Sequence, residues 1–178
     1  MIVIVGESAS GKSSVAKFIK WNYGYKRIIT YTTRQPRHNE KDGLDYYFLT
    51  DDEFEEKKNN GFFAETAEYN GWKYGSAKKD YNDNVVTVLT PKGLRSLKRK
   101  CIDNIFSVYL KVPRRDRLKK CLERGDNIEE AYRRNLSDVG QFDGIEDEVD
   151  CVVDNAEYHM GIQEVAEEII SRYRHERI

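Results

Sequence analysis

The sequence predicts an α/β protein in which helices flank a mostly parallel sheet and an inserted β-rich segment interrupts the alternation. Three observations support this prediction. Fully apolar runs, such as residues 2–5, are typical of buried parallel strands. Helical patterns follow these runs, and the first carries Val15, Phe18 and Ile19 on one face. Strand and turn signals crowd together between about residues 31 and 76, so this part is expected to form a separate subdomain.

Local signals place the elements of the first half. Thr50 and Glu53 have the spacing of a capping box, which predicts the start of a helix. Asn70-Gly71 between two strand-like runs is typical of a tight hairpin turn. The expected elements are a strand over 2–5, a helix over 12–22, extended segments over 25–31 and 44–49, a helix from 50 to about 60, and a hairpin of 62–69 and 72–74.

The second half continues the alternation of strands and helices. Thr90 is expected to cap a helix whose first residue is Pro91, a position where proline is favoured. A basic helix with Arg117 on a solvated face is expected after the third core strand. The expected elements are strands over 85–89, 105–112 and 149–153, and helices from 91, over 114–123, over 127–139 and over 161–173.

The composition sets limits on function. The 178 residues suit one domain, and 30 basic residues nearly balance 31 acidic ones, which gives no electrostatic signature of nucleic-acid or membrane binding. Three dispersed cysteines, Cys101, Cys121 and Cys151, suggest reduced thiols of an intracellular protein. No run is long enough to span a bilayer, so a cytoplasmic location is expected. The three histidines are scattered, and we expect no metal site built from protein side chains alone.

The strongest motif is a phosphate-binding loop, Gly6-Glu7-Ser8-Ala9-Ser10-Gly11-Lys12-Ser13, which matches G-x-x-x-x-G-K-[ST] between a strand and a helix. Its backbone N–H groups and the helix N-terminus suit the β-phosphate of a nucleoside triphosphate. Lys12 is expected to neutralise the β- and γ-phosphates, and the Ser13 hydroxyl is a ligand suited to Mg²⁺. Glu7 is unusual in such a loop, and its side chain is expected to point outward to solvent. The motif predicts a P-loop NTPase core.

A second phosphate-binding pattern follows this loop. Arg34 and Arg37 lie three residues apart around Pro36, and guanidinium groups offer forked donors to a phosphate. Tyr46 and Tyr74 can add neutral hydroxyl donors. Taken alone, the pattern fits a solvated turn with two surface arginines equally well, but the neighbouring P-loop favours phosphate binding. Two phosphate sites on one domain suggest a kinase that transfers a phosphoryl group between them.

These motifs resemble the guanylate kinase family, whose members phosphorylate GMP with ATP. The resemblance covers nearly the whole chain. It implies a core of residues 1–30, 77–123 and 141–178, an NMP-binding subdomain of about 31–76, and a helical lid of about 124–140. The matching segments are Gly6 to Ser13, Thr32 to Arg37, Gly43 to Phe48, Phe63-Ala64-Glu65, Tyr74-Gly75-Ser76, Arg124-Gly125 and Val153-Asp154-Asn155.

The resemblance also implies roles for individual residues. Arg124, with Arg133 or Arg134, should belong to the lid over the ATP phosphates, and the loop at Asn155 should lie near the adenine. The expected GMP site is Thr30, Arg34, Arg37, Tyr46, Glu65, Tyr74 and Ser76, of which Thr30, Glu65 and Ser76 face the guanine. The expected ATP site is Gly6, Glu7, Ser8, Ala9, Ser10, Gly11, Lys12, Ser13, Ser14 and Asn155, and the expected catalytic residues are Lys12, Arg34, Arg124 and Arg134.

The chemistry of Glu65 agrees with guanine, because a carboxylate accepts two adjacent hydrogen bonds and guanine presents N1–H and N2–H₂ side by side. Adenine offers an acceptor at N1 instead. Without the resemblance, an exposed strand carboxylate would be the more common interpretation.

The chain departs from the family pattern at several positions. Family members commonly carry two acidic residues where this chain has Val88 and Thr90, near the metal and the base pocket, and Thr90 is also explained as a plain helix cap. The usual proline and second glycine of the P-loop are Glu7 and Ala9, and the lid helix reads Arg133-Arg134-Asn135, which leaves two adjacent positions open for the lid arginine. These departures leave the catalytic rate and the base selectivity open.

Three functions fit the sequence. The first is ATP- and Mg²⁺-dependent phosphorylation of GMP and dGMP by direct in-line transfer, a step of purine nucleotide metabolism, in a monomer or homodimer without nucleic-acid or membrane partners. The second is a kinase of the same fold that acts on another nucleoside monophosphate or a ribose bisphosphate. The third is a non-catalytic binding module, against which the intact Lys12 and Ser13 argue.

Overall fold

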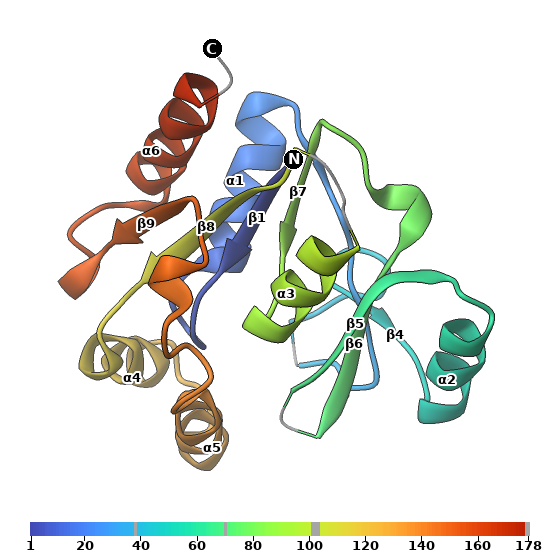
Figure 1. Cartoon of the computed structure of the whole chain (residues 1–178). Helices are drawn as coiled ribbons and strands as arrows, with labels where there is room; N and C mark the ends of the chain where they lie inside the picture. Colours follow the sequence, from blue (N-terminus) through green and yellow to red (C-terminus); the bar gives the residue numbers. More distant parts are fainter. Residues whose placement is uncertain (38, 70, 101–103, 177–178) are drawn as a thin grey trace.

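A computed structural model describes residues 1–37, 39–69, 71–100 and 104–176. The chain forms two sheets, and the larger one is the core of the α/β fold that the sequence predicts (Figure 1). Its five strands have the order β2-β7-β1-β8-β9, and all neighbouring strands are parallel. Their bounds are Ile2–Val5 for β1, Lys26–Arg27 for β2, Val85–Val88 for β7, Phe106–Lys111 for β8 and Cys151–Asp154 for β9.

The first strand, β1, lies in the centre of this sheet, which explains why its four residues are all apolar and fully buried. Ile4 lies opposite Val88 on one side and Val108 on the other. Because the strands are parallel, their carboxyl ends meet at one edge, and the P-loop leaves β1 at that edge. The register of the sheet therefore fixes where the site is built.

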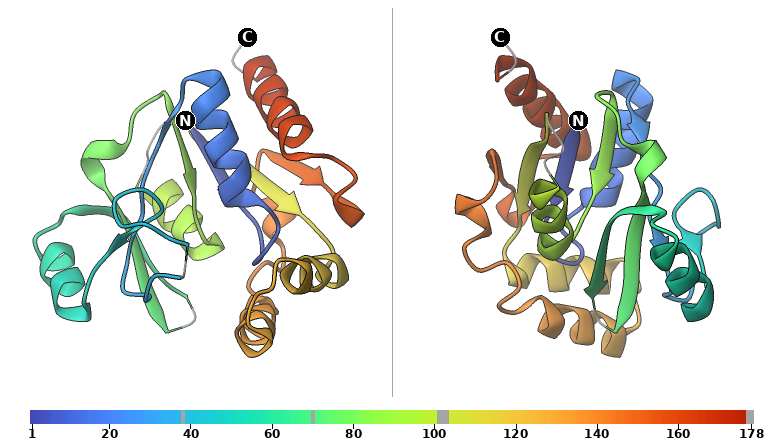
Figure 2. Two further views of the ribbon diagram at one scale, coloured as in Figure 1. Left: turned by 180° about the vertical axis from the view of Figure 1, so that it is seen from behind. Right: turned by 45° about the vertical axis from the view of Figure 1, so that its right-hand side comes forward.

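Helices cover both faces of the larger sheet. Helices α1 (Lys12–Tyr23) and α6 (Ile162–His175) pack on the face of Ile2 and Ile4, and the view from behind in Figure 2 has both in front of the sheet. Helix α3 (Pro91–Arg99) packs on the opposite face with Val3 and Val5. The alternation along β1 sends side chains to the two cores in turn.

The β-rich insertion forms the smaller sheet, of order β4-β3-β6-β5. Strands β5 (Phe63–Tyr69) and β6 (Trp72–Ala77) make the antiparallel hairpin that the sequence predicts, although Asn70 of its turn lies outside the described residues. Helix α2 (Asp51–Asn59) begins with the expected capping box. The segments 25–31 and 44–49 are less regular than expected, since only β2, β3 (Tyr31–Thr32) and β4 (Tyr47–Phe48) pair there.

Two further helices lie below the sheet in Figure 1, opposite the hairpin: α4 (Arg114–Glu123) and α5 (Ile128–Asp138). Short 3₁₀ turns cover Lys78–Asp80, Ile145–Asp147 and Ala156–Tyr158. Cys121 and Cys151 are buried free thiols, and Cys101 lies outside the described residues. Across the described chain, no helix combines the length and the apolar character needed to cross a membrane.

Candidate active site

A cavity of about 660 Å³ lies where the P-loop, the smaller sheet and the α4–α5 region meet. Most of the predicted site residues line it, although they come from widely separated parts of the sequence. Four of them, all within the described residues, lie off its wall: Glu7, Ser10, Ser76 and Asn155. The predicted residues on the wall are Gly6, Ser8, Ala9, Gly11, Lys12, Ser13, Ser14, Thr30, Arg34, Arg37, Tyr46, Glu65, Tyr74, Arg124 and Arg134.

The P-loop passes close beneath strand β8. A Cβ atom on Gly6 would lie 2.7 Å from the carbonyl oxygen of Leu110, so only glycine fits there. Lys12 Nζ donates to the carbonyl oxygen of Glu7 at 2.6 Å, which holds the ammonium across the loop. Burial lowers the pKa of Lys12 to about 8, although the carboxylates of Asp138 and Glu7 oppose this shift. Ligand phosphates here would favour the charged form further.

The side chain of Glu7 does not point to solvent, and that expectation is wrong. It is 14% exposed, and its Oε1 accepts a hydrogen bond from the Tyr109 hydroxyl at 3.0 Å. Arg117 lies 3.8 Å from the same oxygen. The expectation of a solvated Arg117 is also wrong, because this residue is 4% exposed. Glu7 thus turns behind the loop, toward strand β8 and helix α4.

Asp138 joins three parts of the molecule at this point. Its carboxylate accepts hydrogen bonds from the backbone N–H of Ser8 at 2.9 Å, from the Tyr69 hydroxyl and from Arg117 at 3.2 Å. It therefore connects the end of α5 with the P-loop, the tip of the hairpin and helix α4. Neither Asp138 nor Tyr69 belongs to a recognisable motif, so neither was predicted from the sequence.

The two arginines of the second phosphate pattern have different surroundings. Arg34 is buried, and its Nη2 donates to both carboxylate oxygens of Glu40 at 2.9 and 2.8 Å. Its guanidinium carbon lies 5.2 Å from the centre of the Tyr46 ring. Partial burial and the nearby charges of Arg34 and Arg134 lower the pKa of Arg37. Convergent positive charges of this kind favour an anionic ligand.

Glu65 lies deep in the cavity wall, with 1% of the residue exposed, so the alternative of an exposed strand carboxylate is wrong. The pairing of β5 with β6 is irregular between Phe63 and Glu65, and Ala64 and Glu65 are both buried despite being consecutive. The Ser76 hydroxyl donates to Glu65 Oε1. Burial raises the pKa of Glu65 to about 7, opposed by the Ser76 hydrogen bond and the charge of Lys100.

Thr90 and Val88 line the cavity beside Glu65. Thr90 is the N-cap of α3, as predicted, because its hydroxyl accepts the N–H of Gly93 at 3.1 Å. A Cβ atom on Gly93 would lie 3.1 Å from Glu65 Oε2, so this glycine leaves room for the carboxylate. Thr90 is therefore both the N-cap of α3 and a residue of the cavity wall.

The expected lid arginines share one carboxylate. Arg124 Nε donates to Asp126 Oδ1 at 2.7 Å, and Arg134 Nη2 donates to Asp126 Oδ2 at 2.9 Å. These contacts lower the pKa of Asp126 to about 2. Arg133 instead lies over the Trp72 ring, with its guanidinium carbon 4.5 Å from the ring centre. Arg134, on the cavity wall, is thus better placed than Arg133 to meet a ligand.

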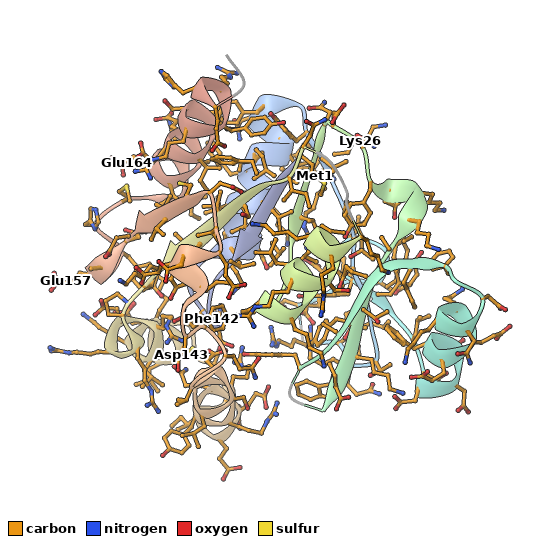
Figure 3. All side chains as sticks on the ribbon, in the orientation of Figure 1. Met1, Lys26, Phe142, Asp143, Glu157 and Glu164 are labelled. Carbon is orange, nitrogen blue, oxygen red and sulfur yellow. The ribbon has the colours of Figure 1, made fainter. Side chains whose placement is uncertain are left out.

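Some residues of the cavity wall belong to no motif and were not predicted, among them Tyr158, Met160 and Phe142. Asn155 lies behind the wall, where its amide group bonds both the carbonyl oxygen and the N–H of Met160. This pair fixes the loop that brings Tyr158 and Met160 to the cavity. Phe142, labelled in Figure 3, lies in the segment that leads from α5 back to the sheet. It also lines the cavity. Apolar residues in loops give no periodic signal, which is why the sequence did not reveal them.

Comparison with known proteins identifies the family of this chain. The family model for guanylate kinase matches residues 1–172. The chain is 32% identical to a guanylate kinase of Onion yellows phytoplasma (strain OY-M), covering 99% of this chain and 85% of that protein. It is 32% identical to a guanylate kinase of Lactococcus lactis subsp. lactis (strain IL1403), covering 100% and 91%.

A solved structure is similar as well. The crystal structure of guanylate kinase from Anaplasma phagocytophilum superimposes with a TM-score of 0.72 at 24% identity, covering all of this chain and 86% of that one. At this identity the match supports the fold. The match of the family model over nearly the whole length gives the assignment: the chain belongs to the guanylate kinase family.

Proposed function

We propose that this protein phosphorylates GMP and dGMP with ATP, giving ADP and the guanosine or deoxyguanosine diphosphate. Family membership supports the reaction, and one observation supports guanine as the base. The carboxylate of Glu65 is buried in the same cavity as the P-loop and the arginine pair. A buried carboxylate requires partners, and guanine supplies two adjacent N–H donors. The alternative acceptors of the same fold have no observation in their favour.

The GMP phosphate oxygen attacks the γ-phosphorus of ATP in line, the bond from the γ-phosphorus to the bridging oxygen breaks, and ADP leaves. No protein base is needed, because the attacking oxygen is already anionic. Arg34 and Arg37, with the hydroxyls of Tyr46 and Tyr74, hold the acceptor phosphate. Lys12, on the P-loop, neutralises the transferred group. Catalysis is then positioning and charge neutralisation.

The lid arginines complete the charge neutralisation in this proposal. Arg124 and Arg134 share Asp126, whose carboxylate orients both guanidinium groups. When the ATP phosphates approach, these groups can keep one contact to Asp126 and turn their remaining N–H donors to the phosphates. Arg133 is assigned no such role, because it stacks on Trp72.

Magnesium fits this site. The Ser13 hydroxyl lies on the cavity wall at the start of α1, and nucleotide phosphates and water provide the remaining oxygen ligands that Mg²⁺ requires. When bound, the ion neutralises charge that develops on the phosphate oxygens. Val88 and Thr90 carry no carboxylate, so we propose a metal site with weak support from the protein.

The domain division, location and assembly belong to the same proposal. We assign the core to residues 1–30, 77–123 and 141–178, the NMP-binding subdomain to 31–76 and the lid to 124–140. We expect a cytoplasmic monomer or homodimer whose partners are its small-molecule substrates, without nucleic acid or membrane.

An acceptor screen tests the proposed function. Purified protein is mixed with ATP, Mg²⁺ and one acceptor at a time, and ADP release is measured for GMP, dGMP, AMP, CMP, UMP and ribose 1,5-bisphosphate. We expect turnover with GMP and dGMP. Turnover with another acceptor and none with GMP would establish a different kinase, and no ADP release with any acceptor would favour a binding module.

A further inference from the structure

A chain of hydrogen bonds leads from the guanine-facing carboxylate to a tyrosine that does not line the cavity. The Ser76 hydroxyl donates to Glu65 Oε1, and the Tyr81 hydroxyl donates to Ser76 Oγ at 3.0 Å. Ser76 is fully buried, and Tyr81 packs beside the core cluster that contains Ala64 and Leu94. The three residues come from β5, β6 and the turn after the 3₁₀ segment Lys78–Asp80.

The direction of these bonds follows from the number of protons. A serine hydroxyl has one proton to donate and accepts through its oxygen. If Tyr81 donates to Ser76, the single Ser76 proton remains available for Glu65. The reverse direction, with Ser76 donating to Tyr81, would remove that donor from the carboxylate. With Tyr81 as the donor, the Ser76 hydroxyl accepts one hydrogen bond and keeps its own proton directed at Glu65.

We infer that Tyr81 is a positioning residue for guanine recognition, acting through Ser76 to keep Glu65 as an ionised acceptor with a fixed orientation. This inference rests on the proposed function. Hydrogen bonds in a chain polarise one another, so the outer donor strengthens the inner one. On the other side of Glu65, Gly93 leaves room for Oε2, because a Cβ atom there would lie 3.1 Å from that oxygen. The chain of hydrogen bonds therefore orients the carboxylate through Oε1.

The charges around Glu65 make its ionisation sensitive to this chain. Burial raises the pKa of Glu65 to about 7, and the donors that oppose this effect are few. Ser76 faces the carboxylate from β6, Tyr81 faces Ser76 from the following turn, and Lys100 acts from the end of α3, where its ammonium donates to the Ala64 carbonyl oxygen. Thr90, at the other end of α3, contributes no charge.

The Tyr81 hydroxyl should therefore affect the discrimination between GMP and AMP as well as the affinity for GMP. An ionised Glu65 accepts from guanine N1–H and N2–H₂, whereas a protonated Glu65 can donate to the N1 acceptor of adenine. Loss of the Tyr81 hydroxyl should favour the protonated form. Discrimination between GMP and AMP should then decrease, and it should decrease most near neutral pH.

The test is Tyr81→Phe, which retains the ring and removes only the hydroxyl, with Tyr23→Phe as a matched control at the far end of α1. Initial rates with GMP and AMP are measured from pH 5.5 to 9. For Tyr81→Phe we expect kcat/KM for GMP at pH 7 to fall about five-fold, the equivalent of one typical hydrogen bond. In the pH profile of kcat/KM for GMP, the acid limb should shift to higher pH by about half a unit. The ratio of kcat/KM for GMP to kcat/KM for AMP should fall. The control should match the wild type in all three quantities.

A double-mutant cycle separates positioning from general packing. In a Ser76→Ala background the chain is already broken, so adding Tyr81→Phe should have no further effect. Any of three results would overturn the inference. These are an equal loss of kcat/KM for GMP and AMP, an acid limb of the pH profile that does not shift, and an effect of Tyr81→Phe that is just as large in the Ser76→Ala background. If the wild type uses GMP and Tyr81→Phe changes none of these quantities, the inference fails and the proposed function stands. A wild type that does not phosphorylate GMP overturns the proposed function and the inference with it.

Discussion

Replacing Glu65 by glutamine should stabilise the fold at alkaline pH while it weakens guanine binding. In the folded protein, burial raises the pKa of Glu65 from 4.5 to about 7. A carboxyl group whose pKa is raised by folding contributes its full stability below pH 4.5, where both states are protonated. That contribution is lost as the pH rises through about 7, because the unfolded chain gains charge that the folded site disfavours. Glutamine carries no charge at any pH.

The size of the effect follows from the shift. About 2.5 pKa units at 1.36 kcal/mol each correspond to about 3 kcal/mol, which is an upper value because glutamine leaves an amide N–H₂ group to be satisfied. Urea unfolding at pH 4.5 and pH 8.5 measures the free energy of unfolding for wild type, Glu65→Gln and the control Glu68→Gln, whose side chain is exposed on the same strand. We expect Glu65→Gln to gain stability over the wild type only at pH 8.5. A difference that is the same at both pH values, or a gain of similar size for Glu68→Gln, would refute the reasoning.

Three further substitutions test other parts of the site. Lys12→Ala should lower kcat by about 10²-fold or more while the protein stays folded, since one preorganised charge contact contributes a few kcal/mol; near-normal turnover, compared with Lys20→Ala, would exclude the P-loop as the catalytic phosphate site. Thr90→Asp keeps the helix cap and adds a carboxylate, so the Mg²⁺ concentration for half-maximal rate should fall relative to Thr90→Ser; an unchanged or higher requirement would mean that Thr90 is only a cap. Gly93→Ala should raise KM for GMP about ten-fold, because the added Cβ atom would press on Glu65 Oε2. It should not lower Tm, because alanine favours a helix more than glycine does; an unchanged KM would show that the carboxylate moves aside without loss of GMP binding.

The elements with strong local signals were predictable from the sequence. The apolar run of β1, the capping box at Thr50 and the Thr90-Pro91 start of α3 each depend on a few neighbouring residues, and the structure has them where expected. The segments 25–31 and 44–49 were less predictable, because their strands depend on pairing with distant partners. Only two-residue strands form there.

The candidate site was predictable where a motif fixes the backbone and not where distant side chains meet. The P-loop and the arginine pair reach one cavity, as the motifs indicated. Glu7 stands in the P-loop and Arg117 in a charged helix, and both look solvated in the sequence, yet strand β8 and helix α4 bring them together behind the loop. Their burial depends on contacts across about a hundred residues of sequence, which local patterns do not encode.

The departures from the family pattern are explained only in part. Ala9 occupies the position of a usual glycine and adopts φ = 67°, a left-handed conformation that costs about 1–2 kcal/mol in a residue with a Cβ. The Tyr158 hydroxyl donates to its carbonyl oxygen at 2.8 Å and helps to hold it. Nothing in the structure explains why Val88 replaces an acidic residue.

The central claim is that a buried Glu65 selects guanine in a phosphoryl-transfer site. It is tested most directly by kcat/KM of the wild type for GMP and for AMP at pH 8, with Glu65→Gln and Arg37→Ala measured alongside. A site built on such hydrogen bonds should favour GMP by roughly 10⁴-fold. Glu65→Gln should erode this ratio, and Arg37→Ala should weaken both substrates alike, because Arg37 is proposed to contact only the phosphate. Equal use of AMP and GMP by the wild type, or an unchanged ratio in Glu65→Gln, would contradict the account.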